Sequence, residues 1–301
     1  MRILVTGSSG LIGSALVPFL TASGHRVIRL VRSQSPTPTQ GESWGWDPER
    51  GTVLSTGRDE PDAVVHLAGA NIAGARWTPG RKALIRDSRV KDTRVLCDAI
   101  GRRSPPPKVL VCASAIGYYG DRGDEILRED SASGSGFLPD VCREWEAACQ
   151  PAAAKSIRVV NLRIGIVLSQ AGGALAKMLT PFKLGAGGVI GSGRQYMSWI
   201  ALDDVASAIH HALTHDSLRG PVNAVAPNPV TNRDFTRTLG RVLSRPTLFP
   251  MPAFVARLAL GEMADALLLA SARVVPARLL ESGFVFRYPD LVGALRHLLR
   301  N

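Results

Sequence analysis

The amino-acid sequence predicts an α/β protein that has a doubly wound parallel sheet and a smaller, mainly helical C-terminal lobe. Through the first half of the chain, short runs rich in Val, Ile and Leu alternate with longer helical stretches. This alternation is typical of a parallel sheet that helices cover on both faces. After residue 226 the pattern changes to short helical stretches interrupted by prolines, which indicates a second, helical part.

Each predicted strand is a short apolar run that contains β-branched residues. The first five are Ile3–Thr6, Arg26–Val31, Ala63–Ala68, Val109–Ala113 and Arg158–Leu162. The helices expected between them are Leu11–Ser23, Pro79–Arg102 and Leu138–Ala154. A further helix is expected at Asp203–His215, and a further strand at Pro221–Val225. The run Ser33–Gly41, rich in Ser, Gln, Pro and Thr, predicts a loop after the second strand.

The composition is that of an ordinary globular chain. Of its 301 residues, 45% are apolar and 20% are charged, which is enough to build a substantial core. No stretch approaches the roughly 20 apolar residues of a membrane helix, and the first residues lack the apolar region of a signal peptide. We therefore expect a cytoplasmic protein without a membrane partner.

The formal charge of +11 raises the question of nucleic-acid binding. The basic residues are spread along the chain without a run of five, so a solvated surface with some arginines directed at cofactor phosphates is the favoured interpretation, and nucleic-acid binding is the lesser alternative. The four cysteines have no metal-ligand spacing, and His210 and His211 have no carboxylate at such spacing. We therefore predict free thiols and no metal site.

A glycine-rich turn, Thr6-Gly7-Ser8-Ser9-Gly10-Leu11-Ile12-Gly13, lies between the first strand and the first helix. In such a turn Gly7 permits the tight bend, Gly10 lets the backbone approach a pyrophosphate, and Gly13 lets the helix pack on the strand. The helix start adds free N–H groups and a partial positive charge. We predict a Rossmann-type dinucleotide site here; the alternative is a strand–turn–helix with no ligand. The predicted cofactor contacts are Gly7, Ser9, Gly10, Leu11, Ile12 and Gly13.

The end of the second strand indicates which dinucleotide is bound. It reads Arg29-Leu30-Val31-Arg32-Ser33, without the carboxylate that would bind the 2′-hydroxyl of NAD. The Arg32 guanidinium, with Ser33 beside it, matches a 2′-phosphate in geometry. NADP(H) is therefore the predicted cofactor and residues 1–226 the NADP-binding domain; a plain surface role for Arg32 is the alternative.

Residues 6–13 and His66-Leu67-Ala68-Gly69 resemble the extended short-chain dehydrogenase/reductase superfamily. Further stretches resemble its atypical, nucleoside-diphosphate-sugar epimerase-like branch; they are residues 67–72, 76–78, 87–90, 114–120, 181–200, 261–263, 281–284 and 287–290. The resemblance implies a Rossmann core and a C-terminal helical domain of unassigned role, here 227–301. It also implies that the glycine-rich segment 165–195 contributes to the substrate-side cleft.

The resemblance implies further cofactor contacts at Leu67, Ala68 and Gly69. In extended relatives an asparagine often occupies the helix position that Arg89 holds here, close to the cofactor. Arg89 is therefore a candidate for a second positive contact, and a surface helix arginine is the alternative.

Active members of the superfamily use a serine and a Tyr-x-x-x-Lys pair, which this chain lacks. The expected helix start, residues 137–146, contains neither tyrosine nor lysine, and Ala115 stands at the serine position. Tyr118 and Tyr119 follow the strand whose end faces the nicotinamide, so either is a candidate proton donor; packing is the alternative for Tyr119. Ser114 is a candidate for binding a substrate carbonyl, or an ordinary strand-end serine.

Two functions therefore remain in view. The leading hypothesis is an NADP(H)-dependent oxidoreductase or epimerase-like protein that acts on an unidentified small molecule, with sugar nucleotides among the candidates, through a nonstandard proton relay. The alternative is a catalytically inactive regulatory or binding module that senses NADPH. The sequence leaves open whether the chain is an enzyme, which substrate it takes, and its oligomeric state.

Overall fold

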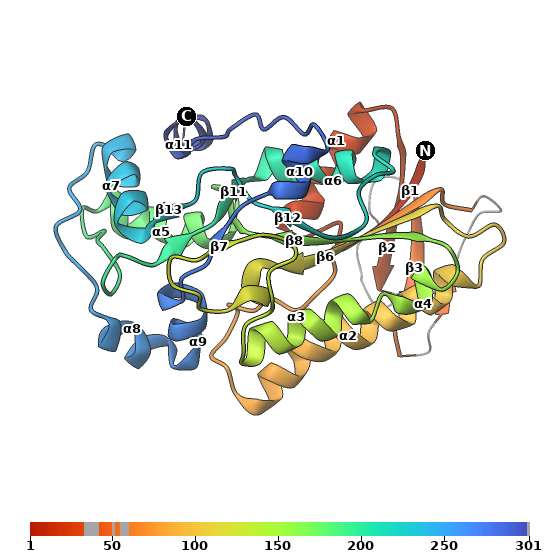
Figure 1. The fold of residues 1–301 in the computed structure, drawn as a ribbon, viewed down its shortest axis with the longest axis horizontal. Helices are drawn as coiled ribbons and strands as arrows, with labels where there is room; N and C mark the ends of the chain where they lie inside the picture. The colour runs from red at the N-terminus through yellow and green to blue at the C-terminus, as the bar shows by residue number, and fades with distance from the viewer. Residues whose placement is uncertain (33–41, 50–51, 55–59, 300–301) are drawn as a thin grey trace.

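A computed structural model describes residues 1–32, 42–49, 52–54 and 60–299. Its centre is an eight-stranded sheet in the order β12-β8-β6-β5-β1-β2-β3-β4 (Figure 1). These strands are β1 (Arg2–Thr6), β2 (Arg26–Arg32), β3 (Ser43–Asp47), β4 (Thr52–Leu54), β5 (Ala63–His66), β6 (Val109–Ala115), β8 (Arg158–Ile164) and β12 (Gly220–Ala224). Every neighbouring pair is parallel except β3 and β4. The predicted doubly wound parallel sheet is confirmed.

Helices cover the sheet on both faces. Helices α1 (Leu11–Ala22) and α6 (Leu202–Thr214) pack against each other on one face. Helices α2 (Pro79–Gly101), α3 (Phe137–Ala147) and α4 (Gln150–Ala153) lie on the other (Figure 1). The middle of the sheet is mainly apolar because both of its faces are buried, as the full burial of Ile3–Val5 in β1 illustrates.

The chain order places a crossover at the middle of the sheet. From β1 the chain proceeds to β2 on one side, whereas β5 and β6 lie on the other. In open α/β sheets, ligands bind at such a switch point, outside the carboxyl ends of the strands. Here that point lies between Thr6, at the end of β1, and His66, at the end of β5, which are paired in register.

Several elements differ from the sequence prediction. Strands β3 and β4 were not predicted, because β3 reads Ser-Trp-Gly-Trp-Asp and buries Trp44 and Trp46 in place of Val or Ile. The single helix predicted over 138–154 is two helices, α3 and α4, with Pro151 in the first turn of the second. The strand predicted to reach Ala68 ends at His66. The predicted loop 33–41 lies outside the described residues.

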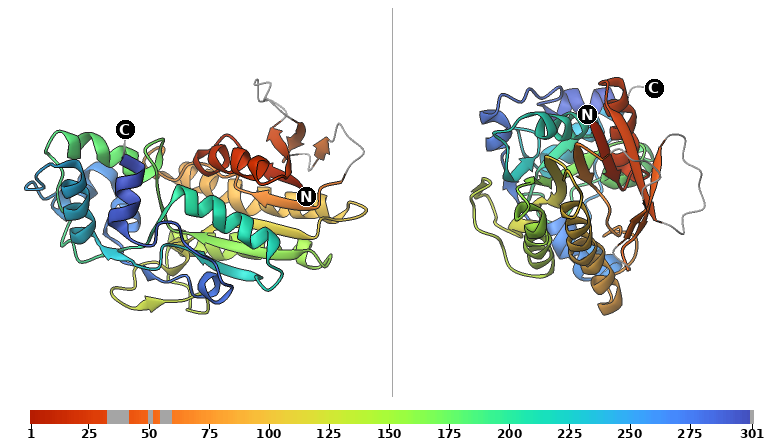
Figure 2. Two further views of the ribbon diagram at one scale, coloured as in Figure 1. Left: turned by 90° about the horizontal axis from the view of Figure 1, so that it is seen from above. Right: turned by 90° about the vertical axis from the view of Figure 1, so that its right-hand side faces the viewer.

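A second group of helices lies beyond the carboxyl ends of β8 and β12 (Figure 2). It comprises α5 (Gly173–Lys183), α7 (Asn232–Leu243), α8 (Ala253–Leu260), α9 (Glu262–Ala264) with a π-helical turn at Asp265–Leu269, and α11 (Leu291–Leu299). Short α10 (Ala277–Glu281) instead packs beside β12. The short strands are β7 (Ile126–Leu127), β9 (Ile166–Leu168), β10 (Tyr196–Met197), β11 (Trp199–Ala201), β13 (Val230–Thr231) and β14 (Arg273–Val274).

Two hydrophobic cores correspond to these two parts of the molecule. The core of the second group joins residues of α5, such as Phe182, to residues of α7 and α11, such as Phe235 and Leu295. The sheet core in turn includes Leu279 and Phe284 from near the C-terminus. The C-terminal chain therefore contributes to both cores. No helix within the described ranges is long and apolar enough to cross a membrane.

Candidate cofactor-binding site

The glycine turn joins β1 to α1 under tight steric restrictions. Gly7 has φ +66°, a conformation that favours glycine. A Cβ at Gly7 would lie 2.7 Å from the carbonyl carbon of Leu67, and a Cβ at Gly13 would lie 2.2 Å from the carbonyl oxygen of Gly7. Since these neighbours are backbone atoms, larger residues at either position require the turn, β5 or α1 to move.

Packing places a smaller restriction on Gly10. A Cβ there would lie 3.3 Å from the Gly7 carbonyl oxygen, and no other heavy atom would lie within 4 Å. Gly10 and its neighbour Ser9 are exposed. Packing within the protein thus restricts Gly10 less than Gly7 or Gly13. An exposed glycine at this position fits the predicted role, which is to let a ligand approach the backbone.

The amino end of α1 has free hydrogen-bond donors. Gly10 is the N-cap residue and supplies no side-chain cap, and the first turn contains no acidic residue. The backbone N–H groups of Leu11, Ile12 and Gly13 have no hydrogen-bond acceptor among the described residues. Such groups, together with the partial positive charge of the helix end, form an anion-binding site. The residues present therefore fit a pyrophosphate.

A buried hydrogen-bond network fixes the strand ends beside this turn. Thr6 Oγ1 accepts hydrogen bonds from the N–H groups of Leu67 and Ala68 at 3.1 and 3.2 Å. Since both of its lone pairs are then used, the Thr6 hydroxyl donates its proton to His66 Nδ1, 2.7 Å away. His66 Nε2 consequently carries the ring proton and donates to Thr93 Oγ1 at 2.9 Å. Burial lowers the pKa of His66 to about 4, so the ring is neutral, as this network requires.

Arg89 lies on the inner side of α2. A Cβ at Gly69 would lie 3.3 Å from its Cζ atom, and its Nη1 donates to the carbonyl oxygens of Ala70 and Ile85 at 2.9 and 3.1 Å. The guanidinium Cζ is also 5.1 Å from the ring centroid of Trp145, and burial lowers the pKa of Arg89. The Arg89 cation therefore lies beside the Leu67–Gly69 segment, where the family resemblance implies a cofactor contact.

Arg32 ends β2 with its side chain 64% exposed, but it has a partner that sequence reasoning missed. Its Nη2 donates to Asp92 Oδ2 on α2 at 3.1 Å, and only 16% of the Asp92 side chain is exposed. The strand end itself contains no carboxylate, as its sequence indicates; the acidic group comes from a helix 60 residues later. Burial raises the pKa of Asp92, although the Arg32 cation opposes that shift. Ser33, the other predicted clamp residue, lies outside the described residues.

The candidate catalytic serine is already bonded. Ser114 is buried at the end of β6, and its hydroxyl donates to Glu146 Oε1 at 2.7 Å. The same carboxylate accepts two hydrogen bonds from Arg163, at 2.8 Å from Nε and 2.9 Å from Nη2. This geometry favours a structural role for Ser114 over binding of a substrate carbonyl, because the hydroxyl proton is committed to Glu146.

Tyr119 is held in a similar way. It is fully buried, and its hydroxyl contacts Asn223 Oδ1 at 2.8 Å, the Arg128 carbonyl at 2.9 Å and Arg163 Nη1 at 3.0 Å. Burial raises the pKa of Tyr119 to about 12, although Arg163 opposes that shift. These contacts argue against proton donation to a substrate and favour the packing role.

Tyr118 differs from the other two candidates. It is half-buried, its ring stacks on the Arg163 guanidinium with Cζ 3.5 Å from the ring centroid, and it packs edge-on against Tyr119. No described residue forms a hydrogen bond with its hydroxyl, and the hydroxyl oxygen is accessible to solvent. Tyr118 is thus the one candidate of the three whose hydroxyl is free to exchange a proton.

Glu146 and Arg163 were not predicted as site residues. A signal was present, because Arg163 is a charged residue between Leu162 and Ile164 in the buried half of β8, and such a residue requires a buried partner. Cys142, near the place of the family lysine, is buried, and burial raises the pKa of its thiol to about 12. It belongs to the packed interior. No group of three or more metal-ligating side chains occurs within the described part of the chain.

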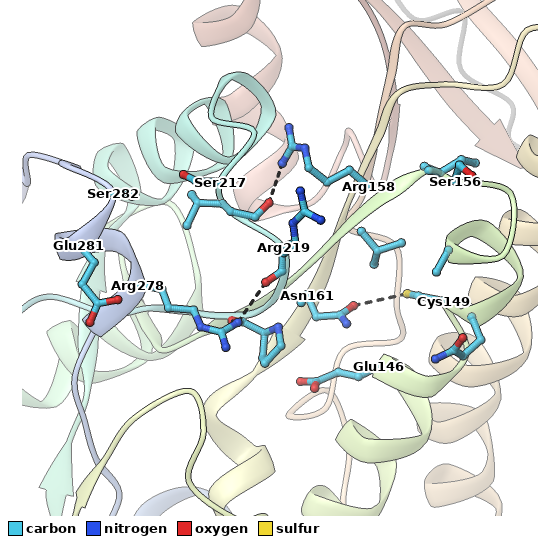
Figure 3. A pocket seen from close by; sticks show the side chains of 17 residues that line it. Glu146, Cys149, Ser156, Arg158, Asn161, Ser217, Arg219, Arg278, Glu281 and Ser282 are labelled. Carbon is cyan, nitrogen blue, oxygen red and sulfur yellow. Dashed lines mark hydrogen bonds between the residues drawn. The ribbon is translucent and has the colours of Figure 1, made fainter.

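A cavity of about 1020 Å³ lies elsewhere, at the amino ends of β8 and β12 (Figure 3). Arg158 and Arg278 line it, but their guanidinium groups donate to backbone carbonyls, among them those of Leu218 and Pro221. The glycine turn is at the opposite, carboxyl edge of the sheet. None of the predicted cofactor-contact residues lines this cavity, whereas Glu146 does.

Comparisons with known proteins show the family of this chain. Residues 3–224 match the model of the NAD dependent epimerase/dehydratase family, and residues 251–298 match a domain of unknown function (DUF1731). An epimerase family protein of Mycobacterium leprae is 42% identical over 295 residues, covering 98% of this chain and 94% of the relative. Epimerase family protein SDR39U1 of Homo sapiens is 36% identical over 302 residues, covering 99% and 100%.

Solved structures of epimerase family proteins are also similar to this chain. The crystal structure of human SDR39U1 (isoform 2) with NADPH has a TM-score of 0.91 at 36% identity, covering 99% of each chain. A nucleoside-diphosphate sugar epimerase from Corynebacterium glutamicum has a TM-score of 0.80 at 39% identity, covering 99% of this chain and 58% of that one. The epimerase-like resemblance is confirmed, and this chain belongs to the NAD dependent epimerase/dehydratase family.

Proposed function

We propose that this protein binds NADP(H) at the glycine turn and uses it as an oxidoreductase or epimerase-like protein on a small-molecule substrate. The observation that carries the proposal is the uncapped amino end of α1, whose free N–H groups lie at the switch point of the sheet. Arg32, with its exposed guanidinium at the end of the adjacent strand, supports NADP(H) over NAD(H). The human relative crystallised with NADPH supports the same choice.

Different residues of the chain would bind different parts of the cofactor. The N–H groups of Leu11 and Ile12 would bind the pyrophosphate, and Arg32 would bind the 2′-phosphate. The Leu67–Gly69 backbone, fixed by Thr6, would form the wall next to the switch point, with Arg89 behind it. When bound, the cofactor supplies hydride exchange at its nicotinamide; the protein supplies orientation and a proton.

Replacing Arg32 by Ala tests the cofactor choice. Loss of a charged, bidentate phosphate contact is expected to weaken NADPH binding by about 10- to 100-fold. NADH binding is expected to change by less than about 3-fold, since NADH has no 2′-phosphate. Calorimetric titration of both proteins with both nucleotides measures these changes. An equal loss for the two nucleotides would contradict the assignment of Arg32 to the 2′-phosphate.

We further propose that Tyr118 exchanges the substrate proton. With Ser114 bonded to Glu146 and Tyr119 to Asn223, Tyr118 is the candidate with an available hydroxyl. The Arg163 guanidinium stacked on its ring fixes the ring plane, so the hydroxyl is held in one direction.

Tyr118→Phe removes this hydroxyl and keeps the stacked ring. A panel of carbonyl compounds and sugar nucleotides, followed by nicotinamide absorbance, would first identify a substrate. For that substrate, the variant is expected to turn over about 100-fold more slowly, within the range of lost acid–base catalysis, with NADPH affinity unchanged. Tyr119→Phe is the matched control: it should lower thermal stability and leave the rate within about 3-fold. A Tyr118→Phe protein of normal rate would exclude this role.

A second function has its own supporting observation. The hydroxyl groups of Ser114 and Tyr119 are held in a structural network. The chain also lacks the Tyr-x-x-x-Lys pair that active members of the superfamily use. This suits a module that senses NADPH without turning it over. Tight NADPH binding, no turnover with any compound of the panel, and partner capture that depends on NADPH would favour this second function.

A further inference from the structure

The pair of Arg32 and Asp92 places a carboxylate next to the proposed 2′-phosphate contact. The Oδ2 atom of Asp92 lies 3.1 Å from Arg32 Nη2. The Arg32 side chain is mostly exposed, whereas that of Asp92 is mostly covered. The carboxylate is thus the fixed member of the pair, and the guanidinium is the member that a ligand can approach.

Asp92 also lies near the carboxyl edge of the sheet, where the glycine turn is. The next residue, Thr93, accepts a hydrogen bond from His66 Nε2, and His66 ends β5 opposite Thr6. Arg32 lies two residues beyond Leu30, which also pairs with Thr6. Both members of the pair are therefore near the carboxyl edge of the sheet, on the side of the glycine turn where β2 ends.

The two ribose substituents that distinguish the dinucleotides would meet opposite chemistry here. The guanidinium has five N–H donors, of which Asp92 engages one, so donors remain for a phosphate. The carboxylate repels a phosphate dianion but accepts a hydrogen bond from a 2′-hydroxyl. A lone arginine would favour NADP(H) strongly; an arginine paired with a carboxylate favours it less.

We propose that Asp92 is a specificity-determining residue. Its carboxylate weakens the preference of this site for NADP(H) and allows NAD(H) to bind as well. The inference rests on the proposed function, since it concerns how the same site discriminates between its two cofactors. Asp92 lies 60 residues along the sequence from Arg32, whereas the choice between NAD(H) and NADP(H) is usually assigned to residues at the end of the second strand.

The test is a set of titrations on Asp92→Asn, Arg32→Ala and the double variant, with NADPH and NADH. Removing the negative charge is expected to raise NADPH affinity about 10-fold and to leave NADH affinity unchanged or slightly lower. In the Arg32→Ala background the gain should shrink, because the contact that the carboxylate competes for is gone. Asp98→Asn, the same charge change at an exposed position of α2, is the matched control and should change neither affinity by more than about 2-fold.

The outcomes separate the two proposals. NADPH binding with an NADPH-to-NADH ratio that Asp92→Asn does not change overturns the role of Asp92 and leaves the cofactor proposal standing. An equal gain for both nucleotides, or the same gain in Asp98→Asn, also overturns it, because the effect would then be one of overall charge. No binding of either nucleotide in any variant overturns both proposals. Asp92→Ser serves as a second neutral variant, and circular dichroism confirms that each protein is folded.

Discussion

Replacing Gly13 by Ala is expected to abolish most nucleotide binding and to destabilise the protein. The new methyl group would lie 2.2 Å from the Gly7 carbonyl oxygen and 2.7 Å from Ser8 Cα. Because both atoms belong to the backbone of the turn, no side-chain rotation relieves the clash, and α1 must shift away from the turn. We expect a loss of about 3 kcal/mol in the free energy of unfolding, at the upper end for overpacking.

The same shift moves the free N–H groups of Leu11 and Ile12. Losing even one of their hydrogen bonds to a charged pyrophosphate is expected to weaken NADPH binding about 100-fold. Urea unfolding and calorimetric titration measure the two effects. Gly80→Ala is the control, since a Cβ there meets nothing within 4 Å and should change stability by less than about 0.5 kcal/mol. Normal NADPH affinity in a folded Gly13→Ala protein would contradict the proposed site.

Replacing Arg163 by Met is the second change with a large expected effect. The Arg163 side chain is 3% exposed, and that of its partner Glu146 is 13% exposed. Removing the cation leaves the buried carboxylate with only the Ser114 hydroxyl as a hydrogen-bond donor among the described residues, and it deprives Tyr119 of a donor. Breaking a buried pair in this way is expected to cost about 3–5 kcal/mol.

A matched pair on the surface provides the comparison. Arg86 also forms two hydrogen bonds to a glutamate of α3, Glu144, but its side chain is 55% exposed. Arg86→Met is therefore expected to cost far less stability than Arg163→Met. Urea unfolding of the two variants measures the difference. If they lost equal stability, the network of Ser114, Glu146 and Arg163 would not be the structural support that we describe.

The local features of the site could be predicted from the sequence. Strand β1, the turn and α1 are contiguous, and the positive φ of Gly7 and the contacts of Gly13 with Gly7 and Ser8 arise within that segment. Strand β3 could not be predicted in the same way, because Trp44 and Trp46 supply its buried face where the other strands use aliphatic residues. Its assignment depends on pairing with β2, which is a tertiary contact.

The charged partners of the site are less visible in the sequence. Arg32 and Asp92 are 60 residues apart and meet only because α2 crosses beside the end of β2. Glu146 and Arg163 belong to a helix and a strand that sequence patterns assign to packing. Sequence reasoning could therefore identify Ser114 and Tyr119 as polar groups near the predicted nicotinamide. It could not show that buried partners already occupy their hydroxyl groups.

The central claim is that the amino end of α1 binds the pyrophosphate of NADP(H), and a crystal structure of the protein soaked with NADPH tests it most directly. The account predicts pyrophosphate oxygens within hydrogen-bond distance of the N–H groups of Leu11 and Ile12, with the 2′-phosphate against Arg32. Nucleotide bound elsewhere, for example in the cavity lined by Arg158 and Arg219, with the α1 turn empty, would contradict it.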